Sequence, residues 1–181
     1  KVIADHGASS VAGIGSGRQT NRDAGIFARF MRQVVGTAHL DTEAGFGYRQ
    51  TLERLGGAPK GEFNDLESCD AILVFGSDMA VEMPVPSLRV IAAAKQRGAK
   101  VVVAAPYRTK LHKISVEPII YAPGAEDALA MALGIVGAPE SAPWDPSTLA
   151  ALSFVPLAQI ESAARLLFGA KKPGIVIGPN A

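Results

Sequence analysis

The stretch GIGSGR, which begins at Gly13, has the glycine spacing of a turn that cradles a phosphate. Gly13 and Gly15 fill the first and third positions of the dinucleotide-binding pattern, but Arg18 stands at the sixth, where a glycine lets a helix pack closely on a strand. Asp41 lies at roughly the twenty-residue distance of an acid that binds a ribose, but it follows only AHL, a poor strand. We therefore interpret Gly15, Ser16 and Arg18 as a weak phosphate-type turn rather than an NAD site.

Two further polar turns follow apolar runs. Gly76, Ser77 and Asp78 come directly after AILVF and could present backbone N–H groups to a phosphate. The alternative is a plain turn in which Ser77 or Asp78 caps the local backbone. Arg108, Thr109 and Lys110 follow VVVAAPY and could form an anion cup, although a solvated basic loop fits the same residues. The sequence leaves both alternatives open.

The other reactive side chains are isolated from one another. Cys69 precedes a strand and is expected to be a small core residue, and Trp144 is expected to anchor its loop to the core. The sequence pattern suggests no catalytic role for Glu43 and Glu82, which are expected at the surface or as caps. The histidines lack metal-ligand spacing and are expected in turns or at the surface: His6, His39 and His112. No catalytic constellation can be assembled from these spacings.

Strands and helices alternate along the chain, which predicts an α/β fold with a doubly wound, mostly parallel sheet flanked by helices. Three continuous apolar runs that enter Gly or Pro turns predict strands buried on both faces, at 71–78, 100–109 and 174–180. Because the carboxyl ends of such strands carry the ligands, the turns named above are the places to look.

Apolar spacing predicts the inward faces of four helices. The first follows an N-cap at Thr20, with Asp23 three residues on, and ends at Gly36; the second begins at Pro84 and ends at Gly98. The residues expected to face inward in the four helices are Phe27, Phe30, Met31 and Val34; Val85, Leu88, Ile91 and Ala92; Leu129, Ala132 and Leu133; and Leu157, Ile160, Ala164 and Leu167.

Composition excludes several classes of partner. The 18 Lys and Arg against 17 Asp and Glu give no electrostatic reason to expect nucleic acid, and no apolar run approaches the roughly 18 residues of a membrane span. The one cysteine cannot form an internal disulfide or hold an iron–sulfur cluster. Both ends look cut, so we expect a fragment of a larger protein. Its expected divisions are an α/β domain at 1–137, a linker or long loop at 138–155, and the start of a further nucleotide-fold segment at 156–181.

Taken in order, the turns resemble the molybdopterin oxidoreductase family. The resemblance rests on GIGSGRQTNRDAG, GTAHLD, GSD with its Pro-flanked helix, APYRT, and YAPG before an Ala-rich helix, and it covers about residues 8–137. The family includes molybdenum formate dehydrogenases and the large iron–sulfur subunit of NADH–quinone oxidoreductase (complex I). The resemblance implies a formate dehydrogenase/DMSO reductase domain-like fold.

Two departures from the family pattern concern the cofactor. Where molybdenum-containing members have a Cys or selenocysteine that ligates the metal, this chain has Gly47 followed by Tyr48, and glycine offers no ligand atom. Where members have an Asp that binds the guanine end of the pterin dinucleotide, this chain has Ala105, and Tyr107 replaces an Arg. Both losses favour the large iron–sulfur subunit of complex I, whose molybdopterin-like region the resemblance implies to be empty framework.

The resemblance therefore implies a non-catalytic scaffold with no cofactor of its own, in a parent chain that carries iron–sulfur clusters. Its partners would be other subunits of a respiratory complex's peripheral arm, in the cytoplasm at the inner face of the cell membrane, without nucleic acid and without direct membrane insertion. Gly15, Ser16 and Arg18 would be relics of a pterin-phosphate turn. The alternatives are an active molybdopterin-dependent oxidoreductase of the formate dehydrogenase type and a nucleotide-binding module, either a Rossmann domain or the central domain of a thiamine-diphosphate enzyme.

Overall fold

The protein is described from a computed structural model, which defines residues 1–42, 61–139 and 143–178. The chain divides into two compact units, Lys1–Lys60 and Gly61–Ala181. Each unit is considered by itself.

The first unit is a small strand–helix–strand unit. After α1 (Val2–His6) and a 3₁₀ turn (Ala8–Ser10), its chain order is β1 (Gly13–Gly15), α2 (Asn21–Arg29), a π-helical extension (Phe30–Val35) and β2 (Leu40–Thr42). Strands β1 and β2 pair in parallel. The predicted ends are confirmed: the Thr20 side chain accepts the Asp23 N–H at 3.2 Å, and Gly36 ends the helix in the left-handed conformation.

Two expectations for this unit are wrong. AHL runs into a real strand, since Leu40 pairs with Gly13. In the predicted apolar stripe only Met31 is buried, while Phe30 and Val34 are exposed. The physical reason is size, because a sheet of two short strands cannot cover a whole helix face.

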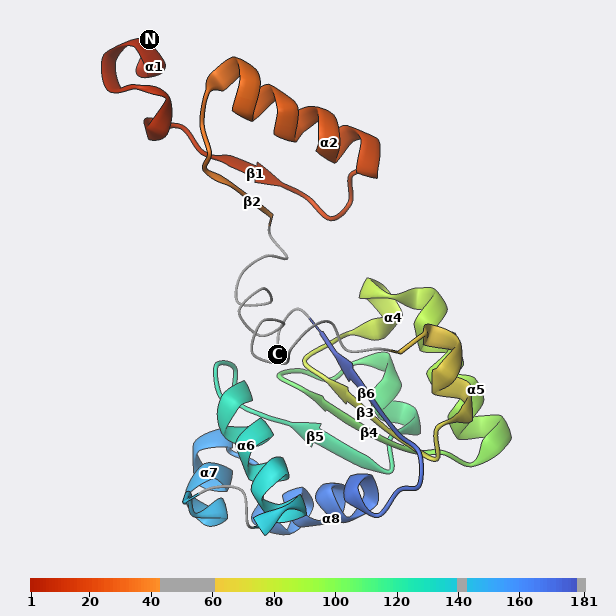
Figure 1. Ribbon diagram of the computed structural model, residues 1–181. Coiled ribbons are helices and arrows are strands. Elements are labelled where there is room, and N and C mark those ends of the chain that lie inside the picture. The colour runs from red at the N-terminus through yellow and green to blue at the C-terminus, as the bar shows by residue number, and fades with distance from the viewer. Residues whose placement is uncertain (43–60, 140–142, 179–181) are drawn as a thin grey trace. The chain divides into compact units, whose positions relative to one another are not determined.

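The second unit holds a four-stranded parallel sheet in the order β5-β4-β3-β6. Its elements, in chain order, are a 3₁₀ helix (Phe63–Ser68), β3 (Ala71–Phe75), α4 (Met79–Glu82), α5 (Pro84–Arg97), β4 (Lys100–Ala105), a 3₁₀ helix (Lys110–Ile114), β5 (Glu117–Ile120), α6 (Glu126–Gly137), α7 (Pro146–Ser153), α8 (Leu157–Phe168) and β6 (Pro173–Ile177). Helices lie on both sides of this sheet (Figure 1), which confirms the predicted α/β fold class.

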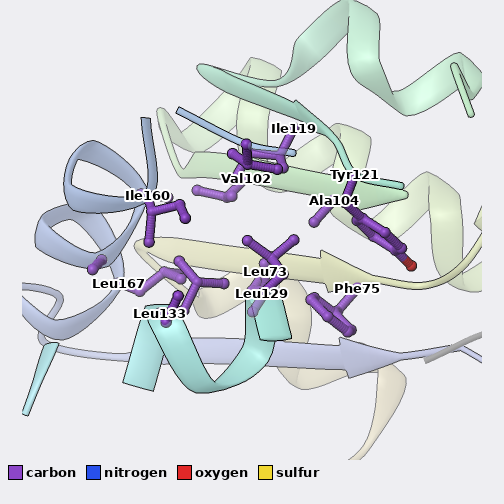
Figure 2. Close-up of a cluster of buried hydrophobic side chains, with 14 of the residues drawn as sticks. Leu73, Phe75, Val102, Ala104, Ile119, Tyr121, Leu129, Leu133, Ile160 and Leu167 are labelled. Carbon is purple, nitrogen blue, oxygen red and sulfur yellow. The ribbon is translucent and has the colours of Figure 1, made fainter. Parts of the chain in front are cut away.

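Each face of the sheet has its own core. On one face Leu73, Val102 and Ile119 pack with side chains of α6, α7 and α8, and Figure 2 shows Leu129 and Leu133 of α6 and Ile160 and Leu167 of α8 around them. On the other face Ile72, Val74, Val101 and Val103 pack with Val90 and Ala93 of α5. We call these the α6–α8 face and the α5 face. Because β3 and β4 are covered on both sides, they read as unbroken apolar runs.

The inward faces of α6 and α8 are confirmed, since Leu129, Leu133, Ile160 and Leu167 are buried. The inward face predicted for α5 is only partly right: Ile91 packs against the core of the α5 face, but Val85 and Leu88 are 67% and 61% exposed. The buried face is instead made by Ser87, Val90 and Ala93. Val85 and Leu88 lie on the side of α5 that this core does not cover.

Residues 138–155 were expected to be a linker, but they contain α7, whose N-cap Asp145 accepts the Thr148 N–H at 3.1 Å. Trp144 is 58% exposed and does not anchor this region to the core. The segment 156–181 does not start another sheet, because β6 pairs with β3. The expected boundary at 137 therefore differs from the observed division between Lys60 and Gly61.

Candidate functional site

All four strands of the second unit run in parallel, so their carboxyl ends meet at one edge of the sheet. Gly76 follows β3, Tyr121 lies just after β5 and Gly178 follows β6, while Pro106 opens the turn after β4. Starting from β3, the chain adds β4 and then β5 on one side of β3, and it then crosses back to add β6 on the other side. The β3/β6 boundary is thus the topological switch point, where open α/β sheets bind ligands.

The turn after β3 is closed by internal hydrogen bonds. Gly76 has a φ of 64° and donates its N–H to the Ala104 carbonyl at 2.9 Å. The Ser77 side chain is buried, and its Oγ donates to Glu82 Oε2 at 2.6 Å. Ser77 was expected to be a phosphate contact or a cap of local backbone, but its hydroxyl instead binds a carboxylate of α4. A carboxylate beside this turn disfavours a second anion there.

Asp78 supplies an unusual group at the switch point. Its Oδ1 is buried and has no hydrogen-bond partner among the described residues, and the side chain does not cap α4. A buried acceptor without a donor is costly, so such atoms often mark a place where something else binds. Asp78 therefore stays a candidate binding residue.

The turn after β6 is packed against the turn after β3. A Cβ added at Gly178 would lie 2.3 Å from the Gly76 carbonyl oxygen and 2.4 Å from Ser77 Cβ. The Gly178 N–H also donates to the Phe75 carbonyl at 2.8 Å. A glycine is needed here because two backbones approach each other.

The turn after β4 contains a buried histidine. His112 Nδ1 accepts the Thr109 N–H at 3.0 Å and lies 2.9 Å from Thr109 Oγ1, and Nε2 lies 3.3 Å from the Ile119 carbonyl oxygen. Because a backbone N–H can only donate, Nδ1 must accept, which leaves the proton on Nε2 facing Ile119. His112 was expected in a turn or at the surface, and it does lie in the 3₁₀ turn after β4, but buried rather than exposed. The positions expected for His6 and His39 are confirmed, since both are exposed.

The residues expected to form an anion cup after β4 differ in exposure, and their binding of an anion stays a prediction. Thr109 is buried with its donors facing His112, whereas Arg108 and Tyr107 are exposed. Ala105 at the end of β4 is 1% exposed and presents a methyl group where the family pattern has a carboxylate.

After β5, the ring of Tyr121 stacks on the ring of Phe75, with 5.7 Å between the ring centroids. Burial of Tyr121, followed by the charges of Glu126 and Tyr107, raises its pKa to about 12.

In the first unit the glycine-rich turn joins β1 to α2. The Arg18 N–H donates to Ser16 Oγ at 3.2 Å, and the Arg18 side chain is exposed. Gly13 is the glycine with a packing role, since a Cβ there would lie 2.7 Å from Leu40 Cδ2. Gly15 has only ordinary contacts, the nearest being Thr42 Cγ2 at 3.5 Å.

The candidate residues thus fall into two sets. Ser77, Asp78, Arg108 and Thr109 share one edge of the second unit's sheet, while Gly15, Ser16 and Arg18 belong to the first unit. Gly47, Tyr48 and Glu43 lie outside the described residues. Sequence reasoning missed that His112 is buried, because it takes the place of the Glu or Gln of a capping box that begins at Thr109, and the usual sequence pattern does not include His.

Within residues 1–42, 61–139 and 143–178, no cluster of three His, Cys, Asp or Glu side chains could hold a metal ion. In the same part of the chain no single helix is long and apolar enough to cross a membrane; α7 and α8 meet that length and hydropathy only together, as a pair bent by 108°.

The model of the molybdopterin oxidoreductase family matches residues 1–138. The NADPH-Fe(3+) oxidoreductase subunit alpha of Geobacter sulfurreducens is 39% identical over 138 residues, which is 74% of this chain and 16% of that protein. An NADH-quinone oxidoreductase subunit of Mycobacterium tuberculosis is 33% identical over 129 residues, 67% of this chain and 16% of that protein. The chain therefore spans about a sixth of the length of these relatives.

Among solved structures, the acetylene hydratase from Pelobacter acetylenicus superposes with a TM-score of 0.71 at 19% identity. The match covers 99% of this chain and 28% of that protein, and at this identity it concerns the fold alone. The resemblance drawn from the turns is confirmed, and the relative with 39% identity is an NADPH-linked enzyme rather than an NADH–quinone oxidoreductase.

Proposed function

Because this chain belongs to the molybdopterin oxidoreductase family, we propose that it is a framework part of a large oxidoreductase subunit, of the type that carries the iron–sulfur clusters of NADH–quinone oxidoreductase. The whole subunit passes electrons from NADH towards quinone through clusters bound outside this chain. The framework part carries out no chemistry of its own. The proposal draws on relatives whose names describe subunits of NADH- and NADPH-linked oxidoreductases.

The observation that carries the proposal is the apolar end of β4. A guanine ring presents N–H donors, and the family's Asp would accept them, but the buried methyl group of Ala105 offers no acceptor. The neighbouring hydroxyls of Ser77 and Thr109 already face Glu82 and His112. The residues at this position do not fit the guanine end of the pterin dinucleotide as the family binds it.

The proposal also assigns partners and a place in the cell. A framework part packs against the cluster-bearing region of its own subunit and against other subunits of a peripheral arm. The complex would hold it in the cytoplasm at the inner face of the cell membrane. Its near-neutral charge of +1 agrees with binding by protein surfaces rather than by nucleic acid.

The test is to purify the full-length polypeptide and to measure molybdenum and tungsten by elemental analysis, with a molybdenum formate dehydrogenase as the positive control. We expect far less than one metal atom per chain and no pterin fluorescence after acid oxidation. Stoichiometric molybdenum or tungsten would overturn the proposal.

Asp78 favours a second candidate, an active molybdopterin-dependent oxidoreductase of the formate dehydrogenase type. Its buried, unpartnered Oδ1 at the switch point is an acceptor that an N–H or O–H of a bound nucleotide would satisfy. This candidate predicts pterin in the purified protein and loss of that pterin in Asp78→Ala. Absence of pterin from the wild-type protein would eliminate it.

A further inference from the structure

The two outer strands of the second unit's sheet are treated differently by the sequence. β5 contains Glu117 and Pro118, a charge and a residue without an N–H, which are typical of a strand that faces solvent. The Pro118 carbonyl also accepts the side-chain N–H of Gln159 from α8 at 2.7 Å. The outer edge of β5 is thus exposed to solvent, but its sequence discourages pairing with another strand.

The outer edge of β6 has one of these protections only at its start, because Pro173 lacks an N–H, and the strand contains no charged residue. Its residues after Pro173 are Gly174, Ile175, Val176 and Ile177, and in the described part of the chain its only partner strand is β3. The Gly178 N–H points to β3, and backbone direction alternates along a strand, so the N–H groups of Ile175 and Ile177 point to the free edge. An apolar edge of this kind is a template for another strand.

An apolar groove runs beside this edge on the α6–α8 face. Its volume is about 430 Å³, and the described residues that line it are apolar or glycine, among them Leu133, Leu167, Phe168, Ile175 and Ile177. Both isoleucines are 64% exposed and Phe168 is 55% exposed. A small-molecule site of this volume normally has a few polar groups that orient the ligand, and the lining supplies no polar side chain.

Chain topology identifies the segment that fits the groove. The crossover from β3 to β4 puts α5 on one face, and the crossover from β5 to β6 runs the opposite way and puts α6, α7 and α8 on the other (Figure 1). Both crossovers therefore have the same handedness, which is consistent with the right-handed form that nearly all such connections take. A further strand outside β6 would continue in the direction of β5 to β6, so its connecting helix would lie on the α6–α8 face, over the groove.

We propose that the groove and the free edge of β6 are the docking surface for the polypeptide that follows β6 in the full-length subunit, which adds a connecting helix and a fifth parallel strand. This rests on the proposed function, since it requires the longer subunit. The matched portion is 28% of the acetylene hydratase chain and 16% of the curated relatives, so such proteins have ample further polypeptide. The helix covers Ile175 and Ile177, and the strand accepts their N–H groups.

The experiment is hydrogen–deuterium exchange on the full-length subunit, read at single amides by fragmentation mass spectrometry. The matched control is Ile120, because the Tyr121 N–H faces β4 and the preceding N–H therefore faces the outer edge of β5. We expect the Ile175 and Ile177 amides to exchange at least about a hundred-fold more slowly than the Ile120 amide, at every protein concentration. Exchange as fast as that of Ile120 would overturn the proposal.

Two other occupants give different results, and either would also overturn it. A second copy of the chain would protect these amides only until dilution separates the copies, and a small apolar molecule would shield the groove without slowing the edge amides. As a second measurement, Ile177→Lys should lower the urea midpoint of the full-length subunit, while Ile120→Lys should not. Neither measurement depends on metal or pterin content, so a failure here is separate from a failure of the proposed function.

Discussion

The carboxylate of Asp70 accepts the backbone N–H of Lys172 at 2.9 Å, although 102 residues separate them in the sequence. The same carboxylate accepts the Lys171 N–H at 2.8 Å, and the Asp70 N–H donates to the Lys172 carbonyl at 3.2 Å. Asp70 precedes β3 and Lys172 precedes β6. This pair of residues therefore fixes where β6 begins along β3, and with it the position of the switch-point turns at the other end.

Asp70→Ala should lower the stability of the second unit, because two backbone donors at the start of β6 lose their acceptor. The measurement is the urea midpoint with the slope unchanged. Asp70→Asn keeps one acceptor oxygen, so its urea midpoint should lie between those of the wild type and Asp70→Ala. An Asp70→Ala protein as stable as the wild type would show that the pair does not fix β6.

The same pair predicts a dependence on acid. The hydrogen bond from the Lys172 N–H lowers the pKa of Asp70 most, and the one from the Lys171 N–H lowers it further. A carboxyl group with a lowered folded-state pKa contributes stability above its unfolded pKa, about 3.9, and loses it as the pH falls through the folded value. The stability difference between wild type and Asp70→Asn should therefore be constant above about pH 5 and shrink below pH 4. A difference that grows in acid would contradict this.

His112→Ala should destabilise the second unit by about 1–3 kcal/mol, because the buried Thr109 N–H loses its acceptor. Thermal or urea unfolding measures the loss. His112→Asn should recover part of it, since the Asn Oδ1 occupies nearly the place of Nδ1 and can accept the same N–H. His39→Ala is the matched control at an exposed position and should have no effect.

Gly178→Ala should cost about 1–3 kcal/mol, because its Cβ would lie 2.3 Å from a backbone oxygen that has no flexible end to move aside. Gly61→Ala is the control in the same unit, since nothing lies within 4 Å of its added Cβ. The urea midpoints of the two variants give the comparison. Equal effects would mean that the turns after β3 and β6 are not in close contact.

The raised pKa of Tyr121 predicts that the stability of the second unit falls at high pH. That pKa is raised to about 12 from 10, chiefly by burial, so the fold favours the protonated ring. The resulting stability is fully present below about pH 10 and is lost as the pH rises through 12. Tyrosinate absorbance should show a group that ionises near pH 12 and is missing from Tyr121→Phe. Ionisation of that group at pH 10 in the folded protein would contradict the prediction.

Much of the fold could be predicted because its information is local. The runs that became β3 and β4 are apolar at nearly every position, and the helix ends at Gly36 and Gly98 use glycine in the left-handed conformation. β5 was missed because Glu117 and Pro118 are uncommon in a strand, and they occur here because its outer edge is exposed. α7 was missed because Pro and small residues around it are typical of a loop.

The candidate site was predicted less well than the fold. Its position followed from the rule that parallel strands present their carboxyl ends together, and Ser77, Asp78, Arg108 and Thr109 do share that edge. The hydrogen bonds of these residues could not be predicted from the same rule. The Ser77 hydroxyl can donate to many acceptors, and it binds Glu82 because α4 places that carboxylate beside it. Spacing alone cannot reveal such a choice.

The sequence by itself determined the family and the alternation of strands and helices, because turn residues and hydrophobic period act over a few neighbouring positions. The tertiary structure alone decided which side of α5 is buried, that His112 is enclosed, that Asp78 Oδ1 is left without a donor among the described residues, and that Asp70 holds Lys172. Each of these depends on atoms brought together from distant parts of the chain, and their energies exist only once the sheet has formed.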